Sequence, residues 1–201
     1  GKVVTLCDSS GTIVDEDGID EEKLAYVMEL KNVKRGRIRE YENKYPNAIY
    51  YDGKSVWDVI KDEGLDVDVA LPCATQNEIN AEHAKALVEK GCKVISEGAN
   101  MPCLPEAVEL FLENNLFYGP GKAANAGGVS VSGLEMSQNS LKLSWSREEV
   151  DNRLKGIMKK IHTSSRDAAK DYGFKENNYV AGSNIAGFIK VANAMLAYGV
   201  V

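Results

Sequence analysis

The chain has 201 residues, of which 44% are hydrophobic and 27% are charged, as is typical of a globular protein with one or two domains. The formal net charge of −6 makes nucleic acid and anionic membranes unexpected partners. No apolar run approaches the roughly 20 residues needed to span a bilayer, so we also expect no membrane segment.

The four cysteines, Cys7, Cys73, Cys92 and Cys103, show no C-x-x-C spacing, and the chain has only two histidines. A metal site is therefore not predicted. Unclustered cysteines of this kind indicate buried, reduced thiols in a cytoplasmic protein.

In its first half the sequence predicts alternating strands and helices. In chain order these are a strand at 3–6, a polar turn at 8–11, a helix around 24–28, a helix around 38–41, and strands at 48–51 and 67–71. The alternation continues with a helix at 80–90, a strand at 93–96, a helix at 105–113 and a strand at 116–118. Strands that alternate with helices through short loops predict an α/β fold with a parallel sheet.

After residue 128 the pattern is helical only. Ser146 and Glu149 have the spacing of a capping box ahead of a long apolar stripe that ends near Tyr172. A last helix is predicted at 185–198. This change in pattern predicts a domain at 1–128 followed by a helical segment at 129–201.

Small polar residues gather where the predicted strands end, at 8–10, 72–77, 97–102 and 119–133. Ligands of open parallel sheets bind at the carboxyl ends of the strands, which favours one shared site. The last segment is rich in glycine, which is favoured where the backbone takes positive φ or lies close to a ligand. A strand-to-helix turn without a ligand would give the same composition.

Two charged features have alternative interpretations. Asp8 ends the first predicted strand, where a carboxylate can bind an adenosine ribose, although aspartate is also common in turns. The cationic stretch at 31–39 is either an anion contact, such as one to a ribose 2′-phosphate, or a solvated helix face. No G-x-G-x-x-G sequence is present.

Five motifs closely resemble the hexameric bacterial-type glutamate dehydrogenases over essentially the whole chain. They are P-C-A-T-Q-N at 72–77, E-G-A-N-M-P at 97–102, K-A-A-N-A-G-G at 122–128, S-G-L-E-M-S-Q-N at 132–139 and N-I-A-G-F at 184–188. The resemblance implies an oxidoreductase of amino-acid and nitrogen metabolism that interconverts L-glutamate with 2-oxoglutarate and ammonia. It further implies a cytoplasmic homohexamer and a nicotinamide cofactor, with NADP favoured and NAD the alternative.

The resemblance also implies roles for individual residues. The cofactor-binding residues would be Asp8, Ser9 and Ser10 at the adenosine ribose, Lys31 at the 2′-phosphate, and Ala74, Thr75, Gln76 and Asn100 near the nicotinamide and its ribose. The substrate-binding residues would be Asn125, Val129 and Ser132.

Relative to that family, the glycine-rich turn and the amino-terminal catalytic domain are expected to lie outside this chain. The resemblance thus implies a Rossmann-like, doubly wound, mostly parallel sheet that lacks its first strand, followed by long carboxyl-terminal helices. No catalytic residue is expected here, and the chain alone is predicted to be inactive. The strand at 3–6 should pair directly with the strand at 67–71, or another copy should fill the gap. The final helix should expose part of its apolar face or pack on a neighbour.

Two alternatives stay open. One is a sister amino-acid dehydrogenase acting on leucine, phenylalanine or valine. The other is a non-catalytic nucleotide-binding or assembly module.

Overall fold

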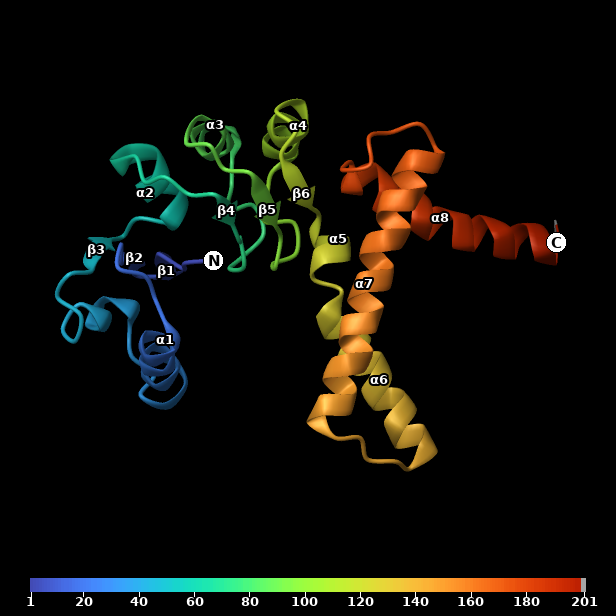
Figure 1. Ribbon diagram of the computed structural model, residues 1–201, viewed down its shortest axis with the longest axis horizontal. Helices are drawn as coiled ribbons and strands as arrows, with labels where there is room; N and C mark the ends of the chain where they lie inside the picture. Colours follow the sequence, from blue (N-terminus) through green and yellow to red (C-terminus); the bar gives the residue numbers. More distant parts are fainter. Residues whose placement is uncertain (200–201) are drawn as a thin grey trace. The chain divides into compact units, whose positions relative to one another are not determined.

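The computed structural model describes residues 1–199, which form two compact units, one of residues 1–66 and one that begins at residue 67 (Figure 1). The boundary that the sequence predicts between residues 128 and 129 lies inside the second unit and stays a prediction. The α/β class is confirmed, since strands and helices occur in both units.

The first unit is built on a small antiparallel sheet with the strand order β1-β2-β3. Its elements are β1 (Thr5–Asp8), β2 (Gly11–Val14), α1 (Glu21–Met28), the π-helical turn η1 (Glu29–Val33), the 3-10 turn η2 (Ile38–Tyr41), β3 (Ile49–Asp52) and α2 (Val56–Glu63). Its core joins side chains from β2, α1, η2 and the loop directly before β3, namely Ile13, Val27, Ile38, Tyr41 and Ala48.

The strand at 3–6 does not pair with the strand at 67–71 in the described chain, so this alternative is wrong, while the filling of the gap by another copy stays a prediction. β1 pairs antiparallel with β2 across the turn at Asp8–Gly11, in the register Thr5 with Val14 and Asp8 with Gly11. A hairpin closes a very short loop, so this local pairing costs little chain entropy. Gly11 allows the arrangement, because a Cβ there would overlap the carbonyl oxygen of Tyr51.

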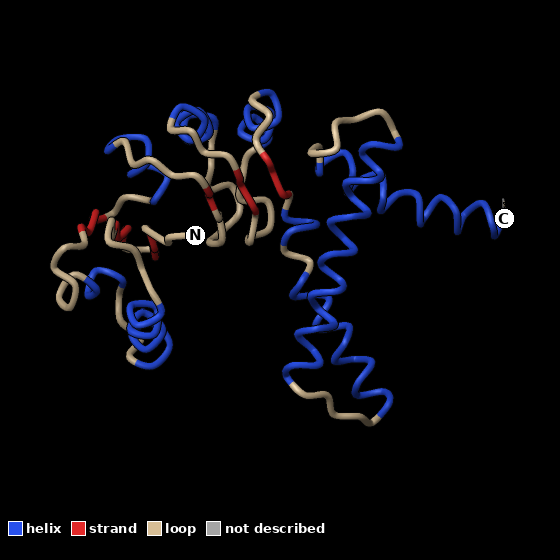
Figure 2. Tube along the Cα trace, in the orientation of Figure 1, coloured by secondary structure: helices blue, strands red, loops and turns tan. Residues whose placement is uncertain are grey.

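The second unit begins with three parallel strands in the order β4-β5-β6, which confirms a parallel sheet in this part of the chain. Its elements are β4 (Val69–Ala70), α3 (Ala81–Glu89), β5 (Val94–Ser96), α4 (Pro105–Glu113), β6 (Phe117–Gly119), α5 (Gly121–Ala124), α6 (Gly127–Leu141), α7 (Arg147–Asp171) and α8 (Tyr179–Tyr198). The crossover helices α3 and α4 lie on the same side of the strands (Figure 2).

Local signals place these helices where the sequence predicts them. The side chain of Asn80 accepts the N–H of His83 at the start of α3, and α4 begins with Pro105. The Ser146 side chain likewise caps α7 by accepting the N–H of Glu149. Gly173, with φ +82°, follows the last turn of that helix.

α7 and α8 pack against each other at a glycine. A Cβ at Gly182 would overlap the carbonyl oxygen of Ser165 on α7, so the two helix backbones are in close contact at this point. Ser165, Ala168 and Ala169 are buried there.

The rest of α8 is half-buried or exposed within the described chain, so part of its apolar face is exposed, as the sequence predicts. Its exposed large apolar residues are Phe188, Val191, Met195, Leu196 and Tyr198. α8 also corrects the expectation that no apolar run is long enough for a membrane span, since it has 20 residues and an 18-residue window within it has a mean hydropathy of 1.2. One such helix is weak evidence for a membrane protein.

No disulfide joins the four cysteines of the described chain, and only two of them are buried. Cys92 and Cys103 lie in the core of the second unit, whereas Cys7 and Cys73 are exposed, so the prediction of four buried thiols is wrong. Cys7 alternates outward on a strand that has one solvated face, and Cys73 lies in a loop.

Candidate functional site

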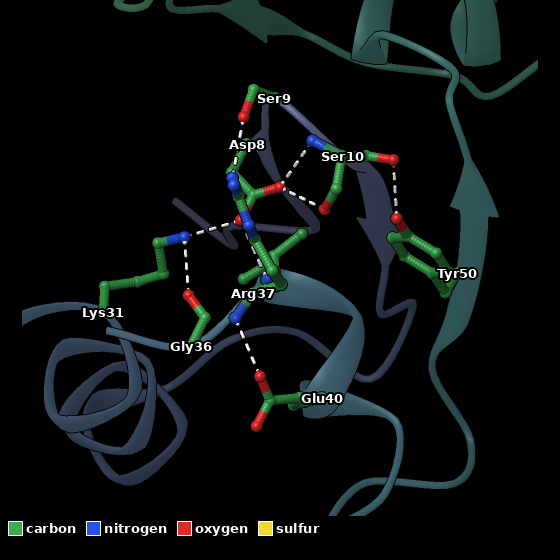
Figure 3. Close-up of polar contacts among 9 residues, drawn as sticks. Asp8, Ser9, Ser10, Lys31, Gly36, Arg37, Glu40 and Tyr50 are labelled. Carbon is green, nitrogen blue, oxygen red and sulfur yellow. Dashed lines mark hydrogen bonds and ion pairs between the residues drawn. The ribbon is translucent and has the colours of Figure 1, made fainter. Parts of the chain in front are cut away.

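The turn after β1 holds a carboxylate that donors enclose on both oxygens (Figure 3). Asp8 Oδ1 accepts the backbone N–H and the hydroxyl of Ser10, at 2.9 and 2.6 Å. Asp8 Oδ2 accepts Lys31 Nζ at 2.6 Å and the backbone N–H of Ile38 at 2.9 Å. The bonds from Lys31 and Ile38 join β1 to η1 and to the start of η2, and the two bonds from Ser10 close the turn.

This environment favours the ionised form of Asp8. Burial alone would raise the carboxyl pKa, but the bonds from Lys31, Ser10 and the Ile38 N–H outweigh that effect and hold the pKa far below its usual range. The four lone-pair positions of the carboxylate are all used. Within this geometry, Asp8 therefore orients Lys31 and the turn before η2, and its direct contact with a ribose stays a prediction.

Two cations lie next to this carboxylate. Lys31 Nζ also donates to the carbonyl oxygen of Gly36 at 3.0 Å, and Arg37 Nη1 donates to Ser9 Oγ at 2.8 Å. The backbone N–H of Arg37 donates to Glu40 Oε1 at 2.8 Å, which fixes the turn that carries this arginine. Ser9 and Arg37 are exposed, and the side chain of Lys31 is 33% exposed. A surface of this kind suits an anion.

The cationic stretch at 31–39 has an exposed part, and its contact with an anion stays a prediction. Lys31 and Arg37 converge on the turn after β1, whereas Lys34, Arg35 and Arg39 are exposed. The sequence assigned only Lys31 to the site. Arg37 was missed, because its approach to Ser9 depends on the turn between η1 and η2.

In the second unit, the loops that follow β4, β5 and β6 are held together at one edge of the sheet. Backbone bonds link them, from Asn77 N–H to the Met101 oxygen at 2.8 Å, from Gly98 N–H to the Pro72 oxygen at 2.9 Å, and from Glu97 N–H to the Gly119 oxygen at 3.0 Å. Three of the four predicted polar strand ends therefore meet in this unit.

The predicted nicotinamide residues lie on the first two of these loops. Ala74, Thr75 and Gln76 are exposed, and the N–H of Ala74 donates to Glu78 Oε1 at 3.1 Å. Asn100 lies on the loop after β5. An exposed loop held by a side-chain bond at its base is available to a ligand.

Asn100 and Asn125, two of the predicted site residues of this unit, are joined by a side-chain hydrogen bond. Asn125 Nδ2 donates to Asn100 Oδ1 at 2.7 Å and to the carbonyl oxygen of Ala99 at 3.2 Å. Val129 and Ser132 follow on α6, where both are exposed, and Val129 is 72% accessible. Their spacing of three residues places them on one face of the helix.

The interpretation of the glycine-rich segment needs a correction. None of its glycines has positive φ, and Gly127, Gly128 and Gly133 lie in α6. Close approach is required only at Gly121, where a Cβ would lie 2.9 Å from the Ala99 oxygen. The other glycines contributed to the prediction of a ligand site, but a regular helical backbone accommodates them equally well.

A buried carboxylate underlies this edge of the sheet. Glu97 is 4% exposed and accepts the hydroxyl of Tyr118 at 2.5 Å, the N–H of Cys103 at 3.3 Å and the N–H of Gly121 at 2.6 Å. Burial and the carboxylate raise the pKa of the Tyr118 hydroxyl and of the Cys103 thiol. No role was predicted for Glu97 from the sequence, although a charged residue directly after a buried strand could have indicated a buried carboxylate.

Residues 1–199 match the family described as Glutamate/Leucine/Phenylalanine/Valine dehydrogenase. The chain belongs to this dehydrogenase family.

Individual members of the family are similar over the whole chain. A glutamate dehydrogenase of Bacteroides thetaiotaomicron is 59% identical over an alignment of 204 positions. The alignment covers 100% of this chain and 44% of that protein. The NADP-specific glutamate dehydrogenase of Giardia intestinalis is 54% identical, again over 100% of this chain and 44% of the relative. The NAD-specific enzyme of Bacteroides fragilis is 45% identical, with coverage of 100% and 43%.

Among solved structures, glutamate dehydrogenase from Plasmodium falciparum superimposes with a TM-score of 0.92 at 44% identity. The match covers 100% of this chain and 42% of that one. The chain therefore spans less than half the length of the family members it matches.

Proposed function

We propose that this chain is part of a glutamate dehydrogenase that interconverts L-glutamate with 2-oxoglutarate and ammonia, using NADP in preference to NAD. The observation that carries the proposal is the contact between Asn125 and Asn100 at 2.7 Å. It brings a residue expected at the substrate next to one expected at the nicotinamide, as hydride transfer requires. The high identity to relatives named glutamate dehydrogenase supports the same assignment.

The turn after β1 supports the coenzyme preference. A 2′-phosphate would carry a charge of about −2 at neutral pH, and Lys31 and Arg37 present two cations beside Ser9. The carboxylate of Asp8 would repel a phosphate if it were uncompensated. Here its charge is matched by Lys31 at 2.6 Å, and donors occupy both of its oxygens. A phosphate can therefore bind beside Asp8, whereas an aspartate without these donors would repel it.

The second unit would hold the other half of the dinucleotide. Ala74, Thr75, Gln76 and Asn100 would bind the nicotinamide ribonucleotide from the loops after β4 and β5, while Asn125, Val129 and Ser132 would bind the amino acid. The dinucleotide supplies the hydride acceptor, and the residues of this chain orient both reactants and limit the access of water. The Glu97 oxygens already accept three hydrogen bonds, so we place the groups that move protons outside this chain.

We further propose that the parallel strands of the second unit belong to a Rossmann-like, doubly wound, mostly parallel sheet. Parallel strands with crossover helices at β4–β6 support this topology. In the order of their sheets, β1 and β4 each have one neighbour and therefore a free edge that a further strand could occupy. The complete protein would be a cytoplasmic homohexamer, for which the exposed apolar residues of α8 supply contact surface.

Kinetics of the full-length protein that contains this chain test the function. We expect oxidative deamination of L-glutamate with a kcat/KM at least about 100-fold above those for leucine, phenylalanine and valine, since a site built for a side-chain carboxylate rejects ligands that lack it. The same assay should give a higher kcat/KM with NADP than with NAD. A preference for an apolar amino acid would favour the sister dehydrogenases, and binding of NADP without turnover would favour the non-catalytic module.

A further inference from the structure

Glu97 is a buried carboxylate with no role in the proposed binding of substrate or coenzyme. It follows β5 directly and is 4% exposed. Transfer of a carboxylate from water into a protein core costs several kcal/mol unless donors surround it. Three donors do so here, from Tyr118, Cys103 and Gly121.

The shortest of its backbone contacts holds the start of α5. Glu97 Oε2 accepts the N–H of Gly121, the first residue of that helix, at 2.6 Å. Gly121 lies tightly against the loop after β5, because a Cβ there would be 2.9 Å from the Ala99 oxygen and 3.1 Å from Glu97 Oε2. The carboxylate therefore keeps α5 in contact with the loop after β5.

The end of the same helix carries Asn125. α5 is a single turn, Gly121–Ala124, and Asn125 is its C-cap. Because the turn is so short, a displacement of Gly121 moves Asn125 as well. The Asn125 amide would then lose its bonds to Ala99 and Asn100, at 3.2 and 2.7 Å.

We propose that Glu97 is a positioning residue, which clamps α5 through the Gly121 N–H and thereby fixes the Asn125 amide against Asn100 for binding of the amino-acid substrate. The inference rests on the proposed function, because it assumes that Asn125 binds the substrate. Glu97 itself touches neither reactant and acts through α5.

The substitution Glu97→Gln in the full-length protein tests the clamp. A glutamine can keep its oxygen toward Tyr118 and Cys103, but its amide nitrogen then faces the Gly121 N–H, so two donors oppose each other. We expect kcat/KM for L-glutamate to fall about 10- to 100-fold, as small displacements of a binding group do, with the KM for NADP changed less than about 2-fold. The control Glu106→Gln, on the exposed side of α4, should leave both unchanged.

A double-mutant cycle separates positioning from general loss of structure. If Glu97 acts through Asn125, then Glu97→Gln should reduce kcat/KM by less than about 2-fold in an Asn125→Ala background. If the reductions in kcat/KM caused by Glu97→Gln and by Asn125→Ala multiply in the double variant, the two residues act independently and the proposal is overturned. A kcat/KM for Glu97→Gln within about 2-fold of wild type would overturn it too.

Gly121→Ala keeps the proposal testable should Glu97→Gln not fold. The added methyl group pushes α5 away from Ala99 and Glu97, whereas the control Gly156→Ala on α7 meets no atom within 4 Å. Gly121→Ala should lower kcat/KM for glutamate and speed amide hydrogen exchange at 121–125, and Gly156→Ala should do neither. Normal exchange and activity in Gly121→Ala would overturn the clamp. If the wild-type protein itself does not oxidise glutamate, the proposed function fails, and altered exchange at 121–125 still reports on the clamp.

Discussion

At the scale of single residues, the most informative side chain of the first unit is a carboxylate with no free lone pair. Asp8 accepts four hydrogen bonds, and one of its donors is the ammonium group of Lys31. Such a residue acts by holding its neighbours in place. Its contribution to coenzyme choice would then come through the position of Lys31.

Lys31 gives a direct test of coenzyme choice. Lys31→Ala should raise the KM for NADP about 10- to 100-fold, because a charge-assisted contact worth about 1.5–3 kcal/mol is lost and Asp8 becomes an unmatched negative charge. The KM for NAD, which has no 2′-phosphate, should change less than about 3-fold.

Lys34→Ala is the matched control for this measurement. Lys34 lies three residues further along, where its half-exposed side chain pairs with Glu29 at 3.0 Å. Its removal should leave both Michaelis constants unchanged. Equal losses for NADP and NAD in Lys31→Ala would show that Lys31 supports the fold and does not recognise the phosphate.

The lowered pKa of Asp8 predicts a pH dependence of stability. The folded-state pKa lies below the ordinary value near 4, so the ionised form stabilises the folded state at higher pH and this stabilisation is lost as the pH falls through the lowered pKa. Asp8→Asn should therefore lower the free energy of unfolding by about 1–3 kcal/mol at pH 7 and at pH 5, and by progressively less below about pH 4.

Denaturant unfolding at these pH values measures the difference between Asp8→Asn and the wild type. Asp151→Asn is the control, since that carboxylate lies in a half-exposed ion pair with Lys155 on α7 and should contribute less than about 1 kcal/mol at any pH. A difference that stays constant from pH 7 to pH 3 would contradict the argument.

At the scale of elements, the sequence predicted those parts of the fold that have local signals. Asn80, Pro105 and Ser146 mark helix starts, and each begins the helix that the structure shows. β2 was missed, because its four residues follow a polar turn and read as part of it. α2 was missed as well, although Ser55 and Asp58 form a capping box at its start.

The residues of the candidate site can also be divided into those with a local signal in the sequence and those without one. The polar strand ends were visible in the sequence, and the loops after β4, β5 and β6 do meet. The contacts of Glu97 with Gly121 and of Arg37 with Ser9 join residues that lie 24 and 28 positions apart. Such pairings depend on tertiary packing, which neither periodicity nor capping encodes.

The α7–α8 contact at Gly182 predicts a sharp difference between two glycines of one helix. Gly182→Ala should destabilise the second unit by about 1–3 kcal/mol, since the methyl group would overlap the backbone of Ser165 and neither helix can yield without shifting. Gly187→Ala meets no atom within 4 Å and should be neutral or stabilise by up to about 1 kcal/mol through helix propensity. Thermal unfolding of the two variants measures the difference, and equal midpoints would mean that the helices do not pack as closely as described.

At the scale of the whole molecule, the helices α6 and α8 expose large apolar residues within the described chain. None of the residues of α6 is buried within the described chain, and Val129, Met136 and Leu141 are exposed there. α8 exposes five large apolar residues. Patches of this kind mark surfaces that contact another protein or another part of the same protein. This agrees with a chain that spans less than half the length of its relatives.

This surface predicts how the 201-residue chain behaves alone. Phe188 and Met195 are 67% and 66% exposed and lie two helical turns apart, so they share one face of α8. The isolated chain should form concentration-dependent oligomers in sedimentation velocity, and the double variant Phe188→Glu with Met195→Glu should sediment as a monomer. Lys190→Gln, at an exposed position on the same helix, should leave the association unchanged.

Flotation with lipid vesicles distinguishes a helix face that contacts protein from one that contacts a membrane. α8 is long and apolar enough to cross a bilayer by composition, so flotation of the isolated chain with neutral lipid vesicles is the decisive comparison. A helix that covers another protein surface should leave the vesicles unbound while the chain still self-associates. Vesicle binding that the double glutamate variant abolishes would instead assign α8 to lipid. A wild-type chain that stays monomeric and unbound would show that these apolar side chains need no partner.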